Sequence, residues 1–520
     1  MSPSVPPLLA AVPARTMSWP DYVALAAYFA LSLAIGWWCS RRKRASSGGF
    51  FLGNRHIPWW AAAISFMATA TSSISFMALP ARTYESDWLS FGSAPAQVLA
   101  GIVVGVFFVA ALRRLELTTI FGYLEQRFDP RVQLLGAGLG ILLKVGGRMS
   151  VVMLLPSLAL STVTGLNVYA SILLMGAVTT VYAMEGGFDA VIWTDVMQVG
   201  VTIGGVAVAL VYMASSVDGG FTGLLHHAAA AGKFRMVSTD WDFTQPTLWV
   251  FIGMFLGHIF TVLGDQPLMQ RMLATADVRA ARRSIVMGNV VGFMGSVMFF
   301  LVGTSLWAFY AAHPERAPAA PLGDKIFPYF IANELPPGVV GLIVAGLFAA
   351  GMGALSSNMN ATAAIVVSDF QGRFRPAATE AERVRLARRA TLAAGAIATG
   401  MAVWLAWRGT TSLWDQYLRL VALIGGGFPG VFALGLLTRR ANPPGVIVGA
   451  LTSVVVTWAV QTFTATSSFF HGFVAVGSCI VVGYLASLAF GGAVRGKKLG
   501  GLTVWDRGDR AQRSTSNVQH

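Results

Sequence analysis

The sequence predicts an all-α, polytopic membrane protein with about 13 transmembrane helices. Only 12% of its 520 residues are charged and 55% are hydrophobic, and its mean hydropathy is +0.64, whereas soluble domains carry about 25% charged residues. A spanning helix needs about 20 apolar residues, so the length allows about a dozen spans beside short connections. No room remains for a large soluble enzyme or cofactor domain.

The net charge of +14 is distributed as expected for a chain in a lipid bilayer. In a soluble protein such a charge would indicate nucleic acid as a partner. Here the basic residues stand in short clusters between apolar runs, as they do in the inner loops of membrane proteins. We therefore expect no nucleic-acid partner.

The first span is predicted at residues 21–38, and it ends just before Arg41, Arg42, Lys43 and Arg44, the densest basic cluster. The segment 1–20 contains prolines where a signal peptide needs an apolar core, so we expect no cleaved signal. Further apolar windows follow at 57–83, 91–112, 132–164, 168–185, 188–214, 246–268, 284–311, 337–368, 388–407, 412–437, 443–463 and 469–491.

Charge then predicts the orientation of this multi-pass protein in the cell inner membrane. An odd number of spans, with the N-terminus outside and the C-terminus in the cytoplasm, places every basic cluster inside. The outer loops hold only scattered basic residues: Arg82, Lys233, Arg316 and Lys325. The predicted inner clusters are Arg113, Arg114, Arg127 and Arg131; Arg271, Arg279, Arg282 and Arg283; the run from Arg373 to Arg389; Arg439 and Arg440; and Arg495, Lys497 and Lys498.

Two spans are predicted to be broken at the middle of the membrane. The second contains the hydroxyl-rich run from Ala68 to Ser75, and the seventh is interrupted by Gly257, His258, Gly264, Asp265 and Pro267. Unwound backbone at this depth is tolerated where it lines a cavity or a bound ion. With the first span set aside, the broken spans each open a group of five helices, as in inverted-repeat transporters. Small-residue helix packing is the alternative explanation of the hydroxyl-rich run.

These boundaries divide the chain into seven parts. The first half comprises an extracytoplasmic segment (1–20), a first helix with its basic loop (21–56), a first repeat (57–214) and an outer loop (215–245). The second half comprises a second repeat (246–437), two C-terminal helices (438–491) and a cytoplasmic tail (492–520).

Several strings resemble the sodium/solute symporter family over nearly the whole chain. The most specific is GGFDAVIWTDVMQ at 186–198, and the others are FLGNRHIPWW at 51–60, TTIFGYLEQRF at 118–128, DQPLMQR at 265–271 and the stretch 355–369. The resemblance implies a leucine-transporter-type core of five plus five inverted helices with an extra N-terminal helix. It also implies alternating access driven by an ion gradient, with Na⁺ as the coupling ion and no other cofactor.

Arg148 is the main candidate for solute binding. It lies well inside an apolar window, with Lys144 one turn earlier on the same helix face. A cation at that depth costs about 3 kcal/mol, so it needs an anionic partner in the protein interior. A solute carboxylate is the natural partner, and the family resemblance points the same way. A permanent salt bridge to Asp195, or capping of broken-helix carbonyls, is the alternative.

Three further residues are predicted to contribute to the solute site. Ser72 and Ser75 share a face of the broken helix and could meet polar atoms of the solute. His258 lies in the other broken span, where it could titrate near neutral pH or simply bond a neighbouring helix.

Asp195 with Ser356 and Ser357 is the main candidate for ion binding, because carboxylate and hydroxyl oxygens suit a hard cation. By resemblance the three correspond to the second sodium position of some family members. Alternatively, the serines bond back to their own helix and Asp195 pairs with a basic residue.

The more widespread sodium site of the family is only partly retained. By resemblance it would use the carbonyls of Ala68, Thr71 and Ala350 and two adjacent hydroxyl residues, but those two positions are Gly353 and Ala354 here. Either an ion binds only at Asp195, or protons replace sodium through Asp195 or His258, or transport is uncoupled.

Two other motifs have mainly structural interpretations. Arg419 lies near a span end, where it is expected to snorkel or to pair with Asp415, and the glycines of 425–430 allow close packing or a flexible gate.

The sequence thus predicts a cation-coupled symporter for uptake of a small organic solute, most plausibly a carboxylate. A transporter-derived sensor is the rival, and an enzyme is not expected, because neither a nucleophile–base pair nor a metal-binding motif is present in the sequence.

Overall fold

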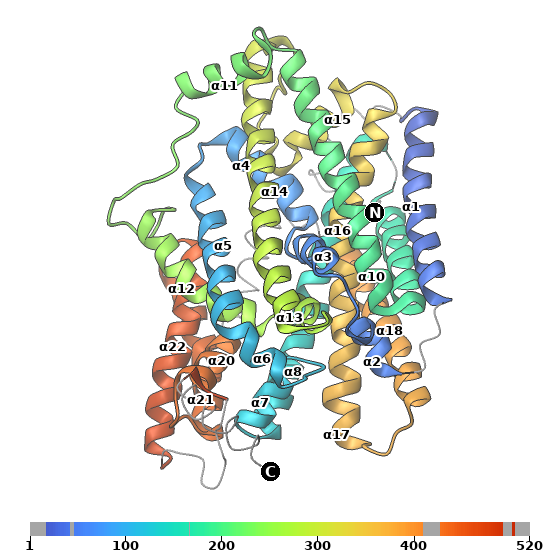
Figure 1. Cartoon of the computed structure of the whole chain (residues 1–520). Helices are drawn as coiled ribbons and strands as arrows, with labels where there is room; N and C mark the ends of the chain where they lie inside the picture. The colour runs from blue at the N-terminus through green and yellow to red at the C-terminus, as the bar shows by residue number, and fades with distance from the viewer. Residues whose placement is uncertain (1–16, 42–45, 166, 409–426, 492–501, 505–520) are drawn as a thin grey trace, which may run out of the picture.

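The protein is helical throughout the part that the computed structural model describes, namely residues 17–41, 46–165, 167–408, 427–491 and 502–504. Within these ranges one β-bridge, between Ile57 and Thr275, interrupts the helical pattern. The predicted all-α class is therefore confirmed (Figure 1).

Short 3₁₀ and π-helical turns, labelled η, connect or interrupt the α-helices. The helices and the three π-helical turns are, in order, α1 (Trp19–Ser40), α2 (Ser47–Leu52), α3 (Trp59–Ala70), α4 (Ser73–Glu85), α5 (Ser93–Val103), η4 (Val104–Phe108), α6 (Val109–Arg114), α7 (Gly122–Arg127), α8 (Pro130–Leu143), η5 (Lys144–Arg148), α9 (Met149–Thr164), α10 (Val168–Ser215), α11 (Gly220–Ala230), α12 (Leu248–Gly264), α13 (Gln266–Leu273), α14 (Val278–Ala312), α15 (Ile326–Glu334), α16 (Val339–Ile365), η8 (Val366–Gln371), α17 (Gly372–Phe374), α18 (Glu380–Arg408), α20 (Gly427–Leu437), α21 (Pro443–Phe463) and α22 (Ser468–Ala489).

Both predicted breaks are present. The pairs α3/α4 and α12/α13 are each bent by 62°. In the first pair Thr71 and Ser72 adopt extended backbone angles, as expected where hydroxyl side chains compete with helical hydrogen bonds. In the second, Asp265 is extended, and Pro267 has no N–H to continue the helix.

The two broken spans are also tied to each other. The amide of Ile57, just before α3, donates to the carbonyl of Ala274, just after α13, at 3.3 Å. This backbone contact forms the β-bridge and holds the start of one broken span against the end of the other.

The number of spans, about 13, stays a prediction. Nine described helices are long and apolar enough to cross a membrane, or 11 if each bent pair is one span. The 48-residue α10 is about 72 Å long, more than twice the hydrocarbon thickness, and kinks at Gly187, whose φ of 55° is in the left-handed region. It therefore has the length of the two windows 168–185 and 188–214. Most of the window 412–437 lies outside the described residues.

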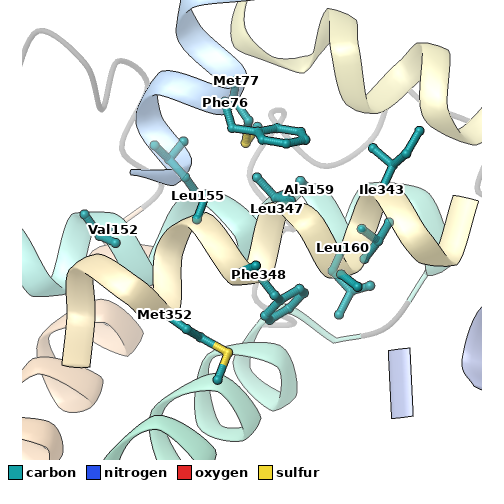
Figure 2. Packing of buried hydrophobic residues seen from close by; sticks show 14 of the residues in the cluster. Phe76, Met77, Val152, Leu155, Ala159, Leu160, Ile343, Leu347, Phe348 and Met352 are labelled. Carbon is teal, nitrogen blue, oxygen red and sulfur yellow. The ribbon is translucent and has the colours of Figure 1, made fainter. Parts of the chain in front are cut away.

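Helix α16 lies at the centre of the molecule and is buried along almost its whole length. Figure 2 shows Leu347 of α16 on the side that faces Leu155 of α9 and Phe76 of α4, whereas Phe348 and Met352 point to the opposite side. Helices α1, α3, α10 and α18 pack around it. Polar residues on α16 are thus held away from lipid.

The additional N-terminal helix is fastened to this central helix by a carboxylate. Asp21 of α1 is 2% exposed, and its Oδ1 accepts hydrogen bonds from the amides of Gly338 at 2.7 Å and Gly341 at 2.8 Å. These amides open α16 and have no acceptor within the helix. Asp21 therefore caps α16 from a neighbouring helix.

Three arginines that the sequence places in inner loops are buried instead. Arg113, Arg127 and Arg271 are 8%, 0% and 1% exposed. Arg127 donates to the carbonyls of Gly435 at 3.0 Å and Thr438 at 2.7 Å. These residues do not report the orientation of the chain, because each donates hydrogen bonds to protein carbonyls or to a carboxylate.

Candidate functional site

A cavity of about 350 Å³ lies between the two breaks. All four predicted solute-site residues, Ser72, Ser75, Arg148 and His258, line it. Its other polar side chains are Gln97, Lys144, Thr261, Asp265, Asn289 and Ser468, and its aromatic side chains are Phe66, Phe121, Phe428, Phe469 and Phe473. The cavity thus combines charged, hydrogen-bonding and apolar surfaces, as small-molecule sites do.

A second hollow is larger, at about 520 Å³, but its wall is mostly apolar. Residues 106–115 and 502–504 form much of it, and it contains none of the predicted site residues. The chemistry is therefore concentrated in the cavity between the breaks.

Arg148 and Lys144 meet a carboxylate that the sequence did not identify as their partner. Both lie on the π-helical turn η5, one turn apart. Arg148 Nη1 is 3.4 Å from Asp265 Oδ2, and Lys144 Nζ is 3.7 Å from Asp265 Oδ1. Asp265 stands at the break between α12 and α13, so the cluster is anchored on an unwound helix.

Arg148 also contacts the other break. Its Nη2 donates to the carbonyl of Thr69 at 2.9 Å, in the last turn of α3, where carbonyls have no partner within the helix. Arg148 therefore links both broken spans. Capping of a broken-helix carbonyl, one of the two alternatives to solute binding, is present; the salt bridge is made to Asp265 and not to Asp195.

Thr69 contacts Arg148 through its carbonyl and the candidate ion site through its hydroxyl. The Thr69 hydroxyl is 3.1 Å from that of Ser357. Asp195 is fully buried, and its Oδ2 accepts from the Ser65 hydroxyl and, at 2.9 Å, from Arg271 Nη2. Asp195 and Ser357 thus lie around a guanidinium that the sequence did not identify, that of Arg271.

Ser356 and Ser357 bond back to their own helix, as the alternative interpretation of these residues expects. Ser356 and Ser357 donate to the carbonyl of Gly353 at 3.2 and 2.6 Å. Arg271 donates to Ser357 Oγ at 2.5 Å and to Ser65 Oγ at 2.8 Å. In this conformation the carboxylate has a basic partner, and the serines bond to their own helix.

Two buried oxygens nevertheless have no hydrogen-bond partner among the described residues: Asp195 Oδ1 and Gln198 Oε1. Both face the missing side chain of Gly353, since a Cβ there would lie 3.2 Å from Asp195 Oδ1 and 3.0 Å from Gln198 Oε1. The same Cβ would lie 3.4 Å from that of Ala68. A small space bounded by two acceptors can hold a hard cation.

The remaining residues of the expected common sodium site are near this space or in the break. Ala68 is buried at the end of α3, Ala350 lies on α16 one turn before Gly353, and Thr71 lies in the break itself. Gly353 and Ala354 offer no side-chain oxygen, so the common site lacks two of its expected ligands.

The glycines at the start of α20 serve close packing. A Cβ at Gly427 would collide with the Ser453 side chain, and one at Gly430 with that of Cys479. Between them, Phe428 lines the cavity between the breaks. Arg419 and Asp415 lie outside the described residues.

Comparison with known proteins assigns the chain to a family. The model of the sodium:solute symporter family matches residues 50–453. The chain is 32% identical to the sodium/sialic acid symporter NanT of Aliivibrio fischeri, over 90% of this chain and 93% of that protein. It is 28% identical to human sodium-coupled monocarboxylate transporter 1, over 83% of this chain and 71% of the relative. These relatives are transporters and not enzymes.

The fold agrees with this assignment. A sodium-coupled sialic acid symporter in a substrate-bound outward-open state superposes with a TM-score of 0.84 at 30% identity, covering 92% of this chain and 99% of that one. The transporter Mhp1, at 12% identity and a TM-score of 0.54, shares the leucine-transporter-type fold. The chain is a multi-pass membrane transporter, and it belongs to the sodium:solute symporter family.

Proposed function

We propose that this symporter takes up a small organic solute that carries a carboxylate, and that the carboxylate binds Arg148. The observation that supports this most is the placement of Arg148 and Lys144 on the wall of a cavity between two broken helices. Asp265, the carboxylate that both contact among the described residues, lies at the long distances of 3.4 and 3.7 Å. Charge-assisted hydrogen bonds are normally about 2.7–2.9 Å long, so Asp265 does not take up the full hydrogen-bonding capacity of either cation.

The relatives support the same class of solute. Two of them, from Aliivibrio fischeri and Proteus mirabilis, are sialic acid symporters, and others are monocarboxylate transporters. Sialic acid is a carboxylated sugar. Sialic acid and short monocarboxylates are therefore the first probes to use.

The rest of the cavity is suited to the body of such a solute. Ser72, Ser75 and His258 would meet its hydroxyl or carbonyl oxygens, together with Gln97 and Asn289. The phenylalanines would cover its apolar face, and they would exclude water from the charged cluster.

For the coupling ion we propose the space over Gly353. Asp195 Oδ1 and Gln198 Oε1 would supply two ligands, and buried acceptors without partners are costly unless something occupies the space between them. Ser356 and Ser357 would join by rotating away from the Gly353 carbonyl. The carbonyls of Ala68, Thr71 and Ala350 would complete a sodium site from the other side.

A second candidate, proton-coupled or uncoupled transport of the same solute, is favoured by Arg271. Its guanidinium already neutralises Asp195 at 2.9 Å, and Gly353 and Ala354 supply no hydroxyl ligands. A cation beside Asp195 would therefore meet a positive neighbour, which lowers its affinity.

Alternating access would move the two repeats, 57–214 and 246–437, against each other around this cavity. We propose that the N-terminus lies outside the cell and the C-terminus in the cytoplasm. The clusters Arg439/Arg440 and Arg373–Arg389 then face inward.

Uptake into proteoliposomes tests the proposal. Labelled sialic acid and short monocarboxylates would be offered under an imposed sodium gradient, an imposed proton gradient, or neither. We expect accumulation that follows the sodium gradient. Accumulation that follows only the proton gradient would favour the second candidate, and equilibration without accumulation would indicate uncoupled transport.

Arg148→Ala tests the carboxylate assignment. We expect uptake to fall by about 100-fold, since a lost charge-assisted pair costs about 3 kcal/mol, whereas Arg148→Lys should retain part of the activity. Arg385→Ala, on the exposed face of α18, is the matched control. Unchanged uptake by Arg148→Ala would refute the role of this residue.

A further inference from the structure

A buried carboxylate fastens the short segment before α7 to the end of the central helix. Thr119 of this segment is 3% exposed, and its hydroxyl donates to Asp369 Oδ1 at 2.8 Å. The side-chain amide of Gln133, on α8, donates to the same oxygen at 2.7 Å. Asp369 lies on η8, which continues α16, and it is 2% exposed. Three elements of the chain thus meet at one oxygen atom.

A second contact holds the same segment to the broken helix. The backbone amide of Ile120 donates to Gln266 Oε1 at 2.7 Å, and Gln266 is fully buried in the first turn of α13. The next residue, Phe121, lines the cavity between the breaks, and its ring centre lies 5.4 Å from that of Phe428. The residues that hold the segment are therefore direct neighbours of a residue that forms the cavity wall.

These contacts join the two proposed repeats at one end of the molecule. Thr119 and Gln133 belong to the first repeat, and Asp369 and Gln266 belong to the second. Helices α7 and α17, which follow the two fastened segments, lie at the same end, opposite α11 and α15 (Figure 1). In the proposed orientation this end faces the cytoplasm. Contacts between repeats at one end of a central site have to break when that end opens.

The hydrogen bonds of Asp369 are suited to a contact that breaks and forms again. Its Oδ1 has two donors, whereas its Oδ2 has no hydrogen-bond partner in the part of the chain that the structure describes. A buried charge with incomplete hydrogen bonding is costly. Water that enters when this end opens would complete those bonds. The open arrangement is therefore close in free energy to the closed one.

We infer that the segment 118–123 is the inner gate of the cavity, with Phe121 closing the cytoplasmic wall and Asp369 and Gln266 holding it shut. Opening breaks the hydrogen bonds of Thr119 and Ile120, and Phe121 then leaves the wall together with the segment. The inference rests on the alternating access and the orientation of the proposed function. It does not depend on which solute or ion is carried.

The test measures how fast a cysteine in the cavity reacts with a membrane-impermeant thiol reagent. Leu139→Cys places this reporter on α8, where residue 139 lines the cavity. Right-side-out and inside-out vesicles that contain the full-length protein expose one face each, and no solute is added. Protein without the reporter gives the background from Cys39 and Cys479, which are both buried.

Thr119→Val removes one of the two donors to Asp369. A hydrogen bond to a charged group shifts an equilibrium by about 10-fold or more, so the reporter should react about 10-fold faster from the cytoplasmic face. Gln133→Met removes the other donor and should act in the same way. Thr119→Ser keeps the hydroxyl and should react at the parent rate. Thr391→Val, at a buried hydroxyl of α18 that donates to the Ala387 carbonyl of its own helix, is the matched control and should change nothing.

A rise confined to the cytoplasmic face in Thr119→Val or Gln133→Met supports the gate. Rates within about two-fold of the parent in both variants would overturn it. A rise at the outer face alone, or at both faces, would also overturn it, because it indicates an outer gate or a general loosening of the fold. Solute uptake is measured separately: if no carboxylate accumulates under any gradient, the proposed function is overturned, and the labelling rates still decide the gate.

Discussion

Replacing Gly353 by alanine should weaken binding at the proposed coupling-ion site without unfolding the protein. A Cβ there would lie 3.0 Å from Gln198 Oε1, 3.2 Å from Asp195 Oδ1 and 3.4 Å from Ala68 Cβ. These separations are tight but tolerable, because a shift of a few tenths of an ångström relieves them. The methyl group would occupy the space in which a cation would contact both oxygens.

The magnitude can be estimated for both alanine and serine. A hydrogen bond to a charged group contributes about 1.5–3 kcal/mol, which corresponds to about 10-fold to 100-fold in affinity. Gly353→Ala should therefore raise the half-saturating sodium concentration at least about 10-fold. Gly353→Ser places the same Cβ in this space, so its added hydroxyl should not restore the affinity that Gly353→Ala loses.

The assay is solute uptake into proteoliposomes at increasing sodium concentrations, with sodium-dependent thermal stabilisation as a second readout. Gly200→Ala is the control, because a Cβ at this glycine of α10 meets no atom within 4 Å. If Gly353→Ala and the wild type require the same sodium concentration, within about two-fold, no coupling ion enters between these oxygens and the reasoning fails.

Three further substitutions test the packing around the site. Asp21→Ala removes the cap of α16 and should lower the free energy of unfolding by about 2–3 kcal/mol, seen as a lower Tm. Asp195→Asn leaves Arg271 without its carboxylate and should lower the free energy of unfolding by about 3–5 kcal/mol. The double variant Asp195→Asn/Arg271→Gln should recover much of the Tm but not sodium dependence. A double variant no more stable than the single one would contradict the pairing. Arg127→Met leaves the carbonyls at the end of α20 unsatisfied, and purified protein should lose about 2–4 kcal/mol; an unchanged Tm would show that these bonds contribute nothing.

The broken helices were predictable from sequence because their causes are local. Pro267 cannot continue a helix, and the hydroxyl run around Ser72 competes for backbone hydrogen bonds within a few residues. The interior orientation of Arg148 followed from the cost of a cation in hydrocarbon. Neither conclusion needed knowledge of which helices are neighbours.

The partners of these residues were not predictable in the same way. Asp265 is 117 positions from Arg148 in the chain, and no periodicity connects them. Arg271 looked like a loop residue because basic clusters in membrane proteins usually mark inner loops. Only the tertiary arrangement shows that Asp195 and Ser65 bury it.

The aromatic residues that line the cavity were also not predictable from the sequence. Phe428 and Phe469 come from helices near the C-terminus, which the sequence treats as additions outside the second repeat or at its end. Aromatic residues in apolar spans are too common to single out, so their role emerges only from the packing of α20 and α22 beside α12 (Figure 1).

Helix α13 is a rod of eight residues, about 12 Å long, with Asp265 at its first end and Arg271 near its last. One end lines the cavity that we assign to the solute, and the other contacts Asp195 of the proposed ion site. A tilt of this rod lengthens or shortens contacts at both ends together. If solute binding tilts α13, it therefore changes the affinity of the proposed ion site. By thermodynamic linkage, ion binding then changes the affinity for the solute by the same factor.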